Sequence, residues 1–216
     1  MQAQAQINAP DILRGEVQIY RESTNGFFNT DNELLDVRST QMRALEETAA
    51  YFSAMIYGWS FSYDIGERSR GIEEVLDLES LGSISFGDSG LAITDTKIEN
   101  MIFSLSSDYH LSSAQQRRMA LWKSGTMRNI QGVGEVFIDN APAKDDWLAI
   151  KRMAIVDAAR QGLRALLQST ERNRPRQAYG LISLSRFPHF WMKGGRWMAA
   201  AQFKVEVKEL VPFAAY

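Results

Sequence analysis

The phrase GEVQIY at residues 15–20 returns almost unchanged as GEVFID at residues 134–139. After the first glycine, Val17 and Ile19 alternate with polar side chains, which is typical of a β-strand with one buried face. The second copy predicts a strand over Glu135–Ile138. We interpret the repeated phrase as the opening strand of a small module that the chain contains twice.

Each copy of the phrase is followed by a long amphipathic segment. The first is predicted to be a helix from Leu34 to Tyr57, which Gly58 ends because glycine tolerates the left-handed conformation. The second helix is predicted from Trp147 to Ser169, ahead of Pro175, which cannot continue a helix. The side chains predicted to form the buried stripes are Met42, Leu45, Ala49, Phe52 and Ile56 in the first helix, and Leu148, Ile155, Ala159, Gly162 and Leu166 in the second.

The two predicted helices also resemble each other in sequence. Laid side by side, they match Ala44 to Ala154 and Glu47 to Asp157. Alanine-rich amphipathic helices can resemble one another by coincidence. The shared order of strand, helix and strand is therefore the stronger sign of duplication.

Strands predicted after each helix complete the two modules. WSFSYDI (59–65) alternates strictly, and Ala178–Ser185 and Trp197–Val207 follow the second helix. A helix laid over a small, mainly antiparallel sheet buries the apolar surfaces of both. The sequence thus predicts an α+β fold of duplicated strand–helix–strand–strand modules. Its parts are a flexible leader at 1–14, a first module at 15–130 with an irregular insert at about 66–130, and a second module at 131–216.

The insert has a less regular pattern than the modules. A hairpin is predicted between Ser83–Phe86 and Leu91–Thr94, across the turn GDSG. Residues Thr96–Ser106 have helical spacing, and Ser113 with Gln116 predicts a capping box that opens a short helix.

Charge is unevenly distributed along the 216 residues, although the net charge is only −2. Residues 1–143 hold 11 Lys and Arg against 20 Asp and Glu, whereas residues 144–216 hold 13 against 6. Such polarity can attract an anionic partner to one end, or bring the basic end of one copy to the acidic end of another. The alternative is that the imbalance only reflects solvated surfaces.

The chain has no cysteine, which excludes disulfides, thiol catalysis and thiolate metal sites. The same absence suits a protein exported to an oxidising compartment. The start MQAQAQINAP resembles the polar stretch that follows a cleaved signal peptide, and the alternative is a plain cytoplasmic start. No run approaches the roughly 20 apolar residues of a membrane helix. We expect a periplasmic or otherwise extracytoplasmic protein without a transmembrane segment.

Motifs for chemistry are weak throughout. His110 and His189 lack spaced metal-ligand partners, and QGVGEV (131–136) contains only part of a dinucleotide-binding motif. No G-x-S-x-G motif occurs. The sequence therefore predicts no catalytic residue, metal or cofactor, and we expect a protein that is not an enzyme. An unrecognised site stays open among four carboxylates of the first module and its insert: Asp64, Glu73, Glu74 and Asp88.

One segment is a candidate binding surface, because it combines large aromatic side chains with cations. It is the predicted loop RFPHFWMKGGRW (186–197), and arginines gather just before it. The candidate residues are Phe187, His189, Phe190, Trp191, Lys193, Arg196 and Trp197, with Arg172, Arg174 and Arg176. Such a surface suits a protein, a glycan or single-stranded nucleic acid, unless its aromatics pack beneath the sheet. Nucleic acid is disfavoured because the chain is acidic and has no RNA-binding signature.

The second module resembles a known family. The helical pattern A-I-x-D-A-A-R-x-x-L (154–163) and a closing strand that begins with Trp197 and ends V-x-V (205–207) are similar to the α+β module of periplasmic LPP-type lipoproteins. They are also similar to flagellar accessory proteins of the FlgO, FlgP and FlgT kind. The resemblance is best over residues 134–210. It implies a non-enzymatic envelope protein that assembles into rings or sheets.

These observations predict an exported structural, assembly or adaptor subunit that acts through protein–protein contacts. Its partners would be other proteins or further copies of itself as a homo-oligomer. The alternative is a module that binds peptidoglycan or another glycan through the aromatic and basic residues of 186–197.

Overall fold

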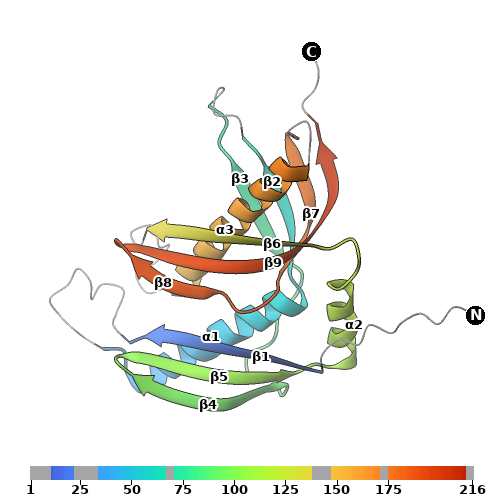
Figure 1. Ribbon diagram of the computed structural model, residues 1–216. Coiled ribbons are helices and arrows are strands. Elements are labelled where there is room, and N and C mark those ends of the chain that lie inside the picture. The colour runs from blue at the N-terminus through green and yellow to red at the C-terminus, as the bar shows by residue number, and fades with distance from the viewer. Residues whose placement is uncertain (1–10, 22–33, 67–70, 138–146, 171–174, 213–216) are drawn as a thin grey trace, which may run out of the picture.

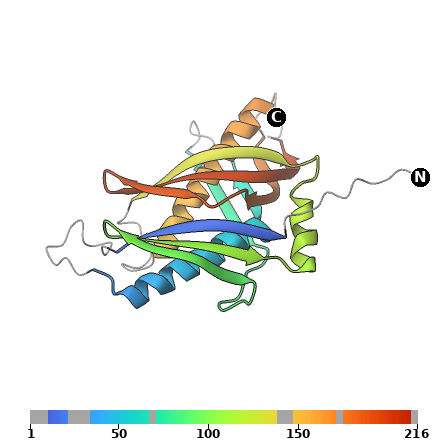
Figure 2. The same ribbon diagram turned by 60° about the horizontal axis from the view of Figure 1, so that its bottom comes forward.

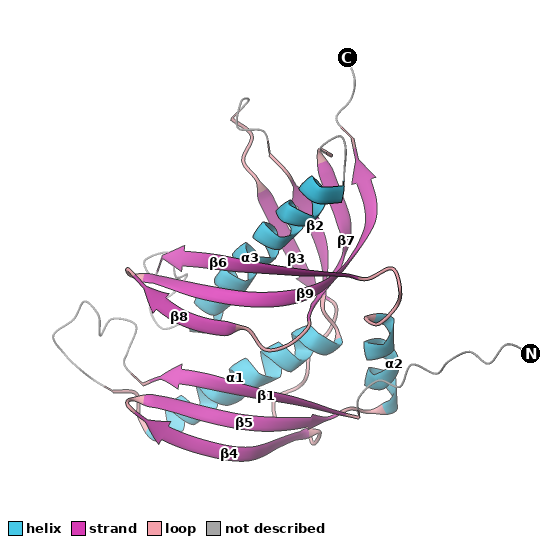
Figure 3. Cartoon of the chain, in the orientation of Figure 1, coloured by secondary structure: helices cyan, strands magenta, loops and turns pink. Residues whose placement is uncertain are grey.

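The computed structural model describes residues 11–21, 34–66, 71–137, 147–170 and 175–212. Three helices and two antiparallel sheets occur in this part of the chain, which confirms the predicted α+β class (Figure 1, Figure 3). The elements are β1 (Ile12–Tyr20), α1 (Val37–Ile56), β2 (Trp59–Asp64), β3 (Val75–Ser80), β4 (Leu91–Glu99), β5 (Ile102–His110), α2 (Ser113–Leu121), β6 (Arg128–Phe137), α3 (Trp147–Thr170), β7 (Gln177–Leu184), β8 (His189–Lys193) and β9 (Arg196–Val211).

The strands form two sheets. The first has the order β1-β5-β4, and α1 packs on β1 and β5. The second has the order β3-β2-β7-β9-β6, with β8 also paired to β9. The long strand β9 joins this sheet together: residues 196–205 pair with β6, and residues 203–211 pair with β7.

The duplicated order survives in three dimensions. In each half a GEV strand, a helix and a closing hairpin follow one another, and the second strand of the hairpin pairs back onto the GEV strand. Figure 1 shows the six strands stacked as β4, β5, β1, β8, β9 and β6, and Figure 2 shows the same order from another side. The strand β2 breaks the repeat, because it leaves α1 and pairs with β7 of the other half.

The register of the two halves differs from the one that the repeated phrase predicts. Both hairpins turn on two residues, so Ile102 after the first turn corresponds to Arg196 after the second. Their partners are Tyr20 and Phe137, respectively. Counting back three residues from Tyr20 and from Phe137 makes Gly134 the structural equivalent of Val17. The repeated phrase aligns Gly134 with Gly15 instead, so the two alignments differ by two residues. A shift of two keeps every side chain on its face of the sheet.

The two helices present corresponding residues to their sheets. Thr40, Ala44 and Thr48 of α1 are fully buried, as are Ile150, Ala154 and Ala158 of α3. These rows fit the alignment of the two helices in sequence. The predicted stripe of α1 was partly wrong, because Met42 is exposed and Tyr51 is buried. The first helix is also shorter than predicted, since Asp36 caps it by accepting a hydrogen bond from the Ser39 N–H at 2.9 Å.

The β6 strand lets α3 approach unusually closely. A Cβ atom on Gly132 would lie 1.9 Å from the Ala158 carbonyl oxygen, and one on Gly134 would lie 2.1 Å from that of Ala154. Only glycine fits between strand and helix at these two positions, since real Cβ contacts are much longer.

The insert differs most from the sequence-based expectation. Residues 83–86 do not form a strand, and β4 pairs with β5, so the helix predicted over 96–106 is wrong. Its period of about four was produced by Ile98 and Ile102, which stand on either side of a hairpin turn. The capping box exists one residue earlier than predicted, between Ser112 and Gln115.

Candidate binding groove between the two long helices

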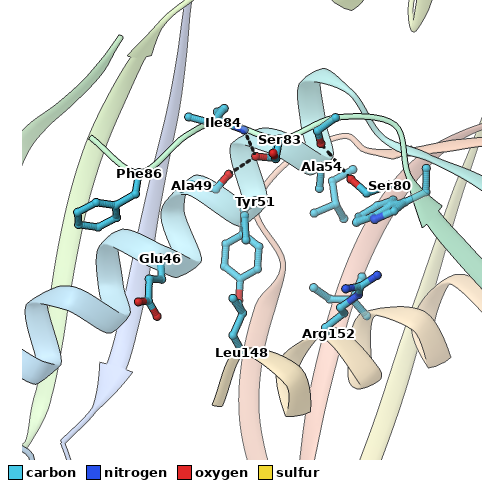
Figure 4. A pocket seen from close by; sticks show the side chains of 16 residues that line it. Glu46, Ala49, Tyr51, Ala54, Ser80, Ser83, Ile84, Phe86, Leu148 and Arg152 are labelled. Atoms are coloured by element: carbon cyan, nitrogen blue, oxygen red, sulfur yellow. Dashed lines mark hydrogen bonds between the residues drawn. The ribbon is translucent and has the colours of Figure 1, made fainter. Parts of the chain in front are cut away.

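An apolar groove lies between α1 and α3, roofed by the segment that follows β3 (Figure 4). Its volume is about 360 Å³, which is within the range of ligand pockets. Short side chains create the space, because three alanines of α1 face the groove where longer residues would fill it. The residues that line the groove include Glu46, Ala49, Ala50, Tyr51, Ser53, Ala54, Phe86, Leu148, Arg152 and Ile155.

A buried serine anchors the roof of the groove. The Ser53 hydroxyl accepts a hydrogen bond from the Ile84 N–H at 2.8 Å and donates to the Ala49 carbonyl at 2.6 Å. The Leu81 N–H also donates to the Gly58 carbonyl at 3.1 Å. These bonds hold residues 81–84 across the C-terminal end of α1. Phe86 then stands at the rim with 64% of its surface exposed.

Two opposite charges flank the mouth of the groove. Glu46 projects from α1 and Arg152 from α3, and Figure 4 shows them on opposite sides of Tyr51 and Leu148. Neither side chain forms an ion pair with another described residue. A ligand with an apolar centre and oppositely charged flanks would therefore find complementary groups here.

A buried ion pair lies behind the groove. The Lys151 ammonium group contacts both carboxylate oxygens of Glu47, at 2.8 and 2.7 Å, and each side chain is only 3% exposed. The ammonium group also donates a hydrogen bond to the Gln18 carbonyl at 3.4 Å. The ammonium group also lies 5.0 Å from the centre of the Phe190 ring. The pair thus joins α1 of one half to α3 of the other in an environment where its charges are hydrogen-bonded.

Tyr51 separates the groove from a second cavity, a slot of about 250 Å³ between β1 and residues 187–190. The Tyr51 hydroxyl donates to Glu47 at 3.2 Å. Burial, reinforced by the Glu47 charge, raises the pKa of Tyr51 well above its ordinary value. The tyrosine is thus neutral and acts as a hydrogen-bond donor. Glu47 and Lys151, which line the same slot, are paired with each other.

Three of the predicted binding residues face inward. Trp197 is fully buried, so its assignment to an exposed binding surface was wrong. Its ring packs against Trp147, with the ring centres 5.3 Å apart. Phe187 packs edge-on against Phe52 at 4.8 Å, and Phe190 stacks on Tyr51 at 6.0 Å. These rings serve largely as a core between the two halves.

Most of the predicted loop over 186–197 belongs instead to the β8–β9 hairpin, which begins at His189, and the outer face of this hairpin carries other predicted residues. His189 stacks on Trp191, with ring centres 5.6 Å apart, and Lys193 is exposed nearby. Arg196 pairs with Glu135 at 2.7 Å and lies over the Phe137 ring.

The predicted arginine cluster is only partly within the described chain. Arg176 is exposed, and its main chain bridges two strands by bonding to Ile65 and Val211. Arg172 and Arg174 lie outside the described residues.

Three of the four carboxylates among which an unrecognised site stayed open form structural contacts. Glu74 pairs with Arg164 and accepts a hydrogen bond from the Tyr63 hydroxyl. Burial acts to raise the pKa of Glu74, but the Arg164 and Tyr63 hydrogen bonds outweigh it and hold that pKa below its ordinary value. Asp64 accepts from Gln177 at 3.0 Å, and Asp88 accepts from the Gly90 N–H at 2.8 Å. Glu73 is exposed.

Sequence reasoning missed the groove itself. Of its three alanines, only Ala49 was predicted to face a core, as part of the buried stripe, and Ala50, Ala54 and Ser53 had no assigned role. The available signal was the pair of small residues at Ala50 and Ala54, one turn apart on the side of α1 that lines the groove. Pairs of this kind leave room on a helix surface, but the sequence does not show what fills that room.

Within the described ranges, no helix has the length and apolar character needed to cross a membrane. In the same residues, no group of three or more His, Asp or Glu side chains gathers closely enough to hold a metal ion.

Comparison with known proteins identifies relatives in sequence. A model of a family of uncharacterised proteins matches residues 2–213. An uncharacterized protein of Treponema pallidum (strain Nichols) is 21% identical over 183 residues, which is 83% of this chain and 73% of that protein. No solved structure matches.

Proposed function

The chain belongs to the family whose model matches residues 2–213, and we propose that it is a non-enzymatic adaptor or assembly subunit that binds another protein. The proposal rests on the α1–α3 groove. The groove binds an apolar segment of the partner, with a basic residue of that segment near Glu46 and an acidic residue near Arg152.

The composition of the groove supports a binding role without catalysis. Its walls are mainly alanine and larger apolar side chains. The Ser53 hydroxyl is already hydrogen-bonded to two main-chain groups. An apolar pocket with few convergent polar groups favours recognition. The exposed Phe86 at the rim suits an interface anchor, because aromatic side chains supply large contact areas at low entropic cost.

A peptide library displayed on phage tests this function directly. Selection on the purified chain is expected to enrich peptides that have an apolar centre between a basic and an acidic residue. Replacing Ala50 with tryptophan fills the groove, so a selected peptide should bind the A50W variant at least about tenfold more weakly, a loss of about 1.4 kcal/mol.

The matched control is Ala165→Trp, which adds the same side chain to an exposed position of α3. This variant should bind the selected peptide as the unmodified chain does. Equal binding to the A50W variant, or a selection that enriches no shared pattern, would contradict the groove as a recognition site.

The proposed location is extracytoplasmic, as the resemblance to envelope proteins and the absence of cysteine suggest. Fractionation of the native cells checks this part separately. Release of the protein with the periplasmic or surface fraction agrees with it, whereas recovery only with cytoplasmic markers would overturn the location without affecting the groove.

A glycan-binding role is the second candidate, and the stacked pair of His189 and Trp191 is the observation that favours it. Sugars stack on flat aromatic faces, and Lys193 lies close in the same strand. In this case insoluble peptidoglycan should capture the chain, and Trp191→Ala should release it. Capture that is unchanged in the Trp191→Ala variant would reject this candidate.

A further inference from the structure

We infer that copies of this chain associate head to tail, with the β6 edge of one copy against the β4 edge of the next. This inference rests on the proposed assembly role, but it uses a surface separate from the α1–α3 groove. Its basis is that the contact between the two halves inside one molecule can be repeated between molecules.

The two halves have equivalent strands in the same direction. In Figure 1 the arrowheads of β1, β4, β6 and β8 all point to the same side. Reading upward, β4, β5 and β1 of the first half correspond to β8, β9 and β6 of the second. The internal junction therefore places β1 beside β8. The next equivalent junction in the stack places β6 beside a β4 strand, which only another copy can supply.

The internal junction is made by side chains, since β1 and β8 do not pair with each other. Tyr20, the last residue of β1, lies edge-on to Trp197 of β9 with ring centres 5.7 Å apart. Met192 of β8 packs against the same buried cluster. An aromatic residue at the end of the GEV strand and an apolar residue next to the hairpin turn thus pack against one shared cluster.

The outer edges carry the same two kinds of residue in the same places. By register, Phe137 at the end of β6 corresponds to Tyr20, and Ile98 of β4 corresponds to Met192. Phe137 is 47% exposed and Ile98 is 48% exposed. Large apolar side chains exposed at both ends match what the internal junction buries.

No helix or strand of the described residues covers the face of β4 that carries Ile98. Ile98 pairs with Phe103 of β5, which is buried, so both side chains point to the face that carries α1. The helix packs on β1 and β5, and β4 extends beyond it. Ile93, also on this face, is 53% exposed.

The distribution of charge favours unlike ends. Residues 1–127, which precede β6, carry 10 Lys and Arg against 18 Asp and Glu, whereas residues 128–216, which begin with β6, carry 14 against 8. Contact between the first half of one copy and the second half of another brings opposite net charges together. Two identical ends would bring like charges together instead. Such a heterologous contact continues as an open chain or closes as a ring.

Sedimentation velocity over a range of concentration and salt tests the inference. The unmodified chain should form species larger than a monomer that dissociate as salt rises, because screening weakens attraction between the ends. Ile98→Glu blocks the β4 end and Phe137→Glu blocks the β6 end, so each variant alone should sediment as a monomer. Leu121→Glu places the same change on the exposed surface of α2 and should assemble normally.

Mixing the two blocked variants distinguishes this contact from others. Each retains one intact end, so an equimolar mixture should form a one-to-one dimer and no larger species. A symmetric dimer through β4 would leave the Phe137→Glu variant dimeric and would overturn the inference. A monomer at every concentration of the unmodified chain would also overturn it.

Binding of the selected peptide reports separately on the proposed function. Both blocked variants leave the α1–α3 groove intact, so they should bind that peptide with unchanged affinity. Failure of assembly with intact peptide binding rejects the head-to-tail contact alone. Assembly without peptide binding rejects the groove alone.

Discussion

The two halves of the molecule follow the same order of elements but bury their helices differently. In the second half, α3 lies directly on β6. A Cβ atom at Gly132 or Gly134 would lie only 1.9 or 2.1 Å from a carbonyl oxygen of α3. In the first half the position matching Gly134 is Val17, and α1 packs through large side chains such as Phe52. A close contact between backbone atoms cannot be relieved by a change of side-chain rotamer, whereas a contact between side chains can. We therefore expect the second half to tolerate added volume between helix and sheet less well than the first half.

Removing the buried cation that joins the halves should have the largest effect. Lys151→Met leaves the Glu47 carboxylate buried without a partner, so we expect the free energy of unfolding to fall by about 3–5 kcal/mol. Urea denaturation measures this change. The double variant Glu47→Leu with Lys151→Met should recover most of the loss, because apolar residues can replace a buried pair.

The exposed pair between Arg196 and Glu135 is the control for this experiment. Breaking it with Glu135→Gln should cost less than about 1 kcal/mol, since solvent screens exposed pairs. A similarly small loss in the Lys151→Met variant would mean that the buried pair does not hold the halves together.

Adding one methyl group to the β6 strand should have the next largest effect. Gly132→Ala forces the Ala158 carbonyl away, and we expect a loss of about 3 kcal/mol in the free energy of unfolding. The corresponding change in the first half, Gly15→Ala, meets only the Phe187 ring. That side chain can turn aside, so the cost there should be clearly smaller.

Equal losses from the two glycine substitutions would show that both helices are held equally rigidly against their sheets. Urea denaturation of both variants, with the slopes compared as well as the midpoints, makes this comparison.

The two hairpin turns differ in backbone strain, and we expect this difference to change the stability by a smaller amount. Asn100 and Met101 adopt left-handed φ angles of 47° and 66°, where the second half has Gly194 and Gly195 at 56° and 71°. A side chain such as that of Met101 is strained in this conformation. Met101→Gly should therefore stabilise the chain by about 1 kcal/mol, which thermal unfolding can detect.

The converse substitution, Gly195→Met, should destabilise the second hairpin. An unchanged melting temperature in the Met101→Gly variant would show that burial elsewhere compensates for the strained backbone.

The smallest effect concerns the strand β3, which Glu74 helps to attach to α3 through Arg164. Because the pKa of Glu74 is lower in the folded chain, this contact stabilises the fold above the ordinary carboxyl pKa of 4.5 and is lost as pH falls through the folded value. Glu74→Gln should make the free energy of unfolding less sensitive to pH between about 5 and 3. An unchanged acid dependence in that variant would assign the effect to other carboxylates.

Much of the local structure was predictable because it depends on neighbours in sequence. Alternation located the closing strands, and the helical period located α1 and α3 to within a few residues. The hairpin of β4 and β5 was missed because its apolar residues happen to fall at helical spacing across the turn. The buried Lys151 was missed as well, since a lysine in a helix is usually exposed and its partner Glu47 lies 104 residues away.

The sequence by itself determined the α+β class, the repeated order of strand and helix, the unequal distribution of charge and the lack of cysteine. These properties follow from composition and from short-range periodicity. Tertiary structure decided the rest. It turned Phe187, Phe190 and Trp197 inward, paired β2 with the other half, and opened a groove at the alanines of α1. Each of these features depends on which surfaces, distant in sequence, come into contact. The apolar area that is buried, and with it the favourable free energy, is set by those contacts.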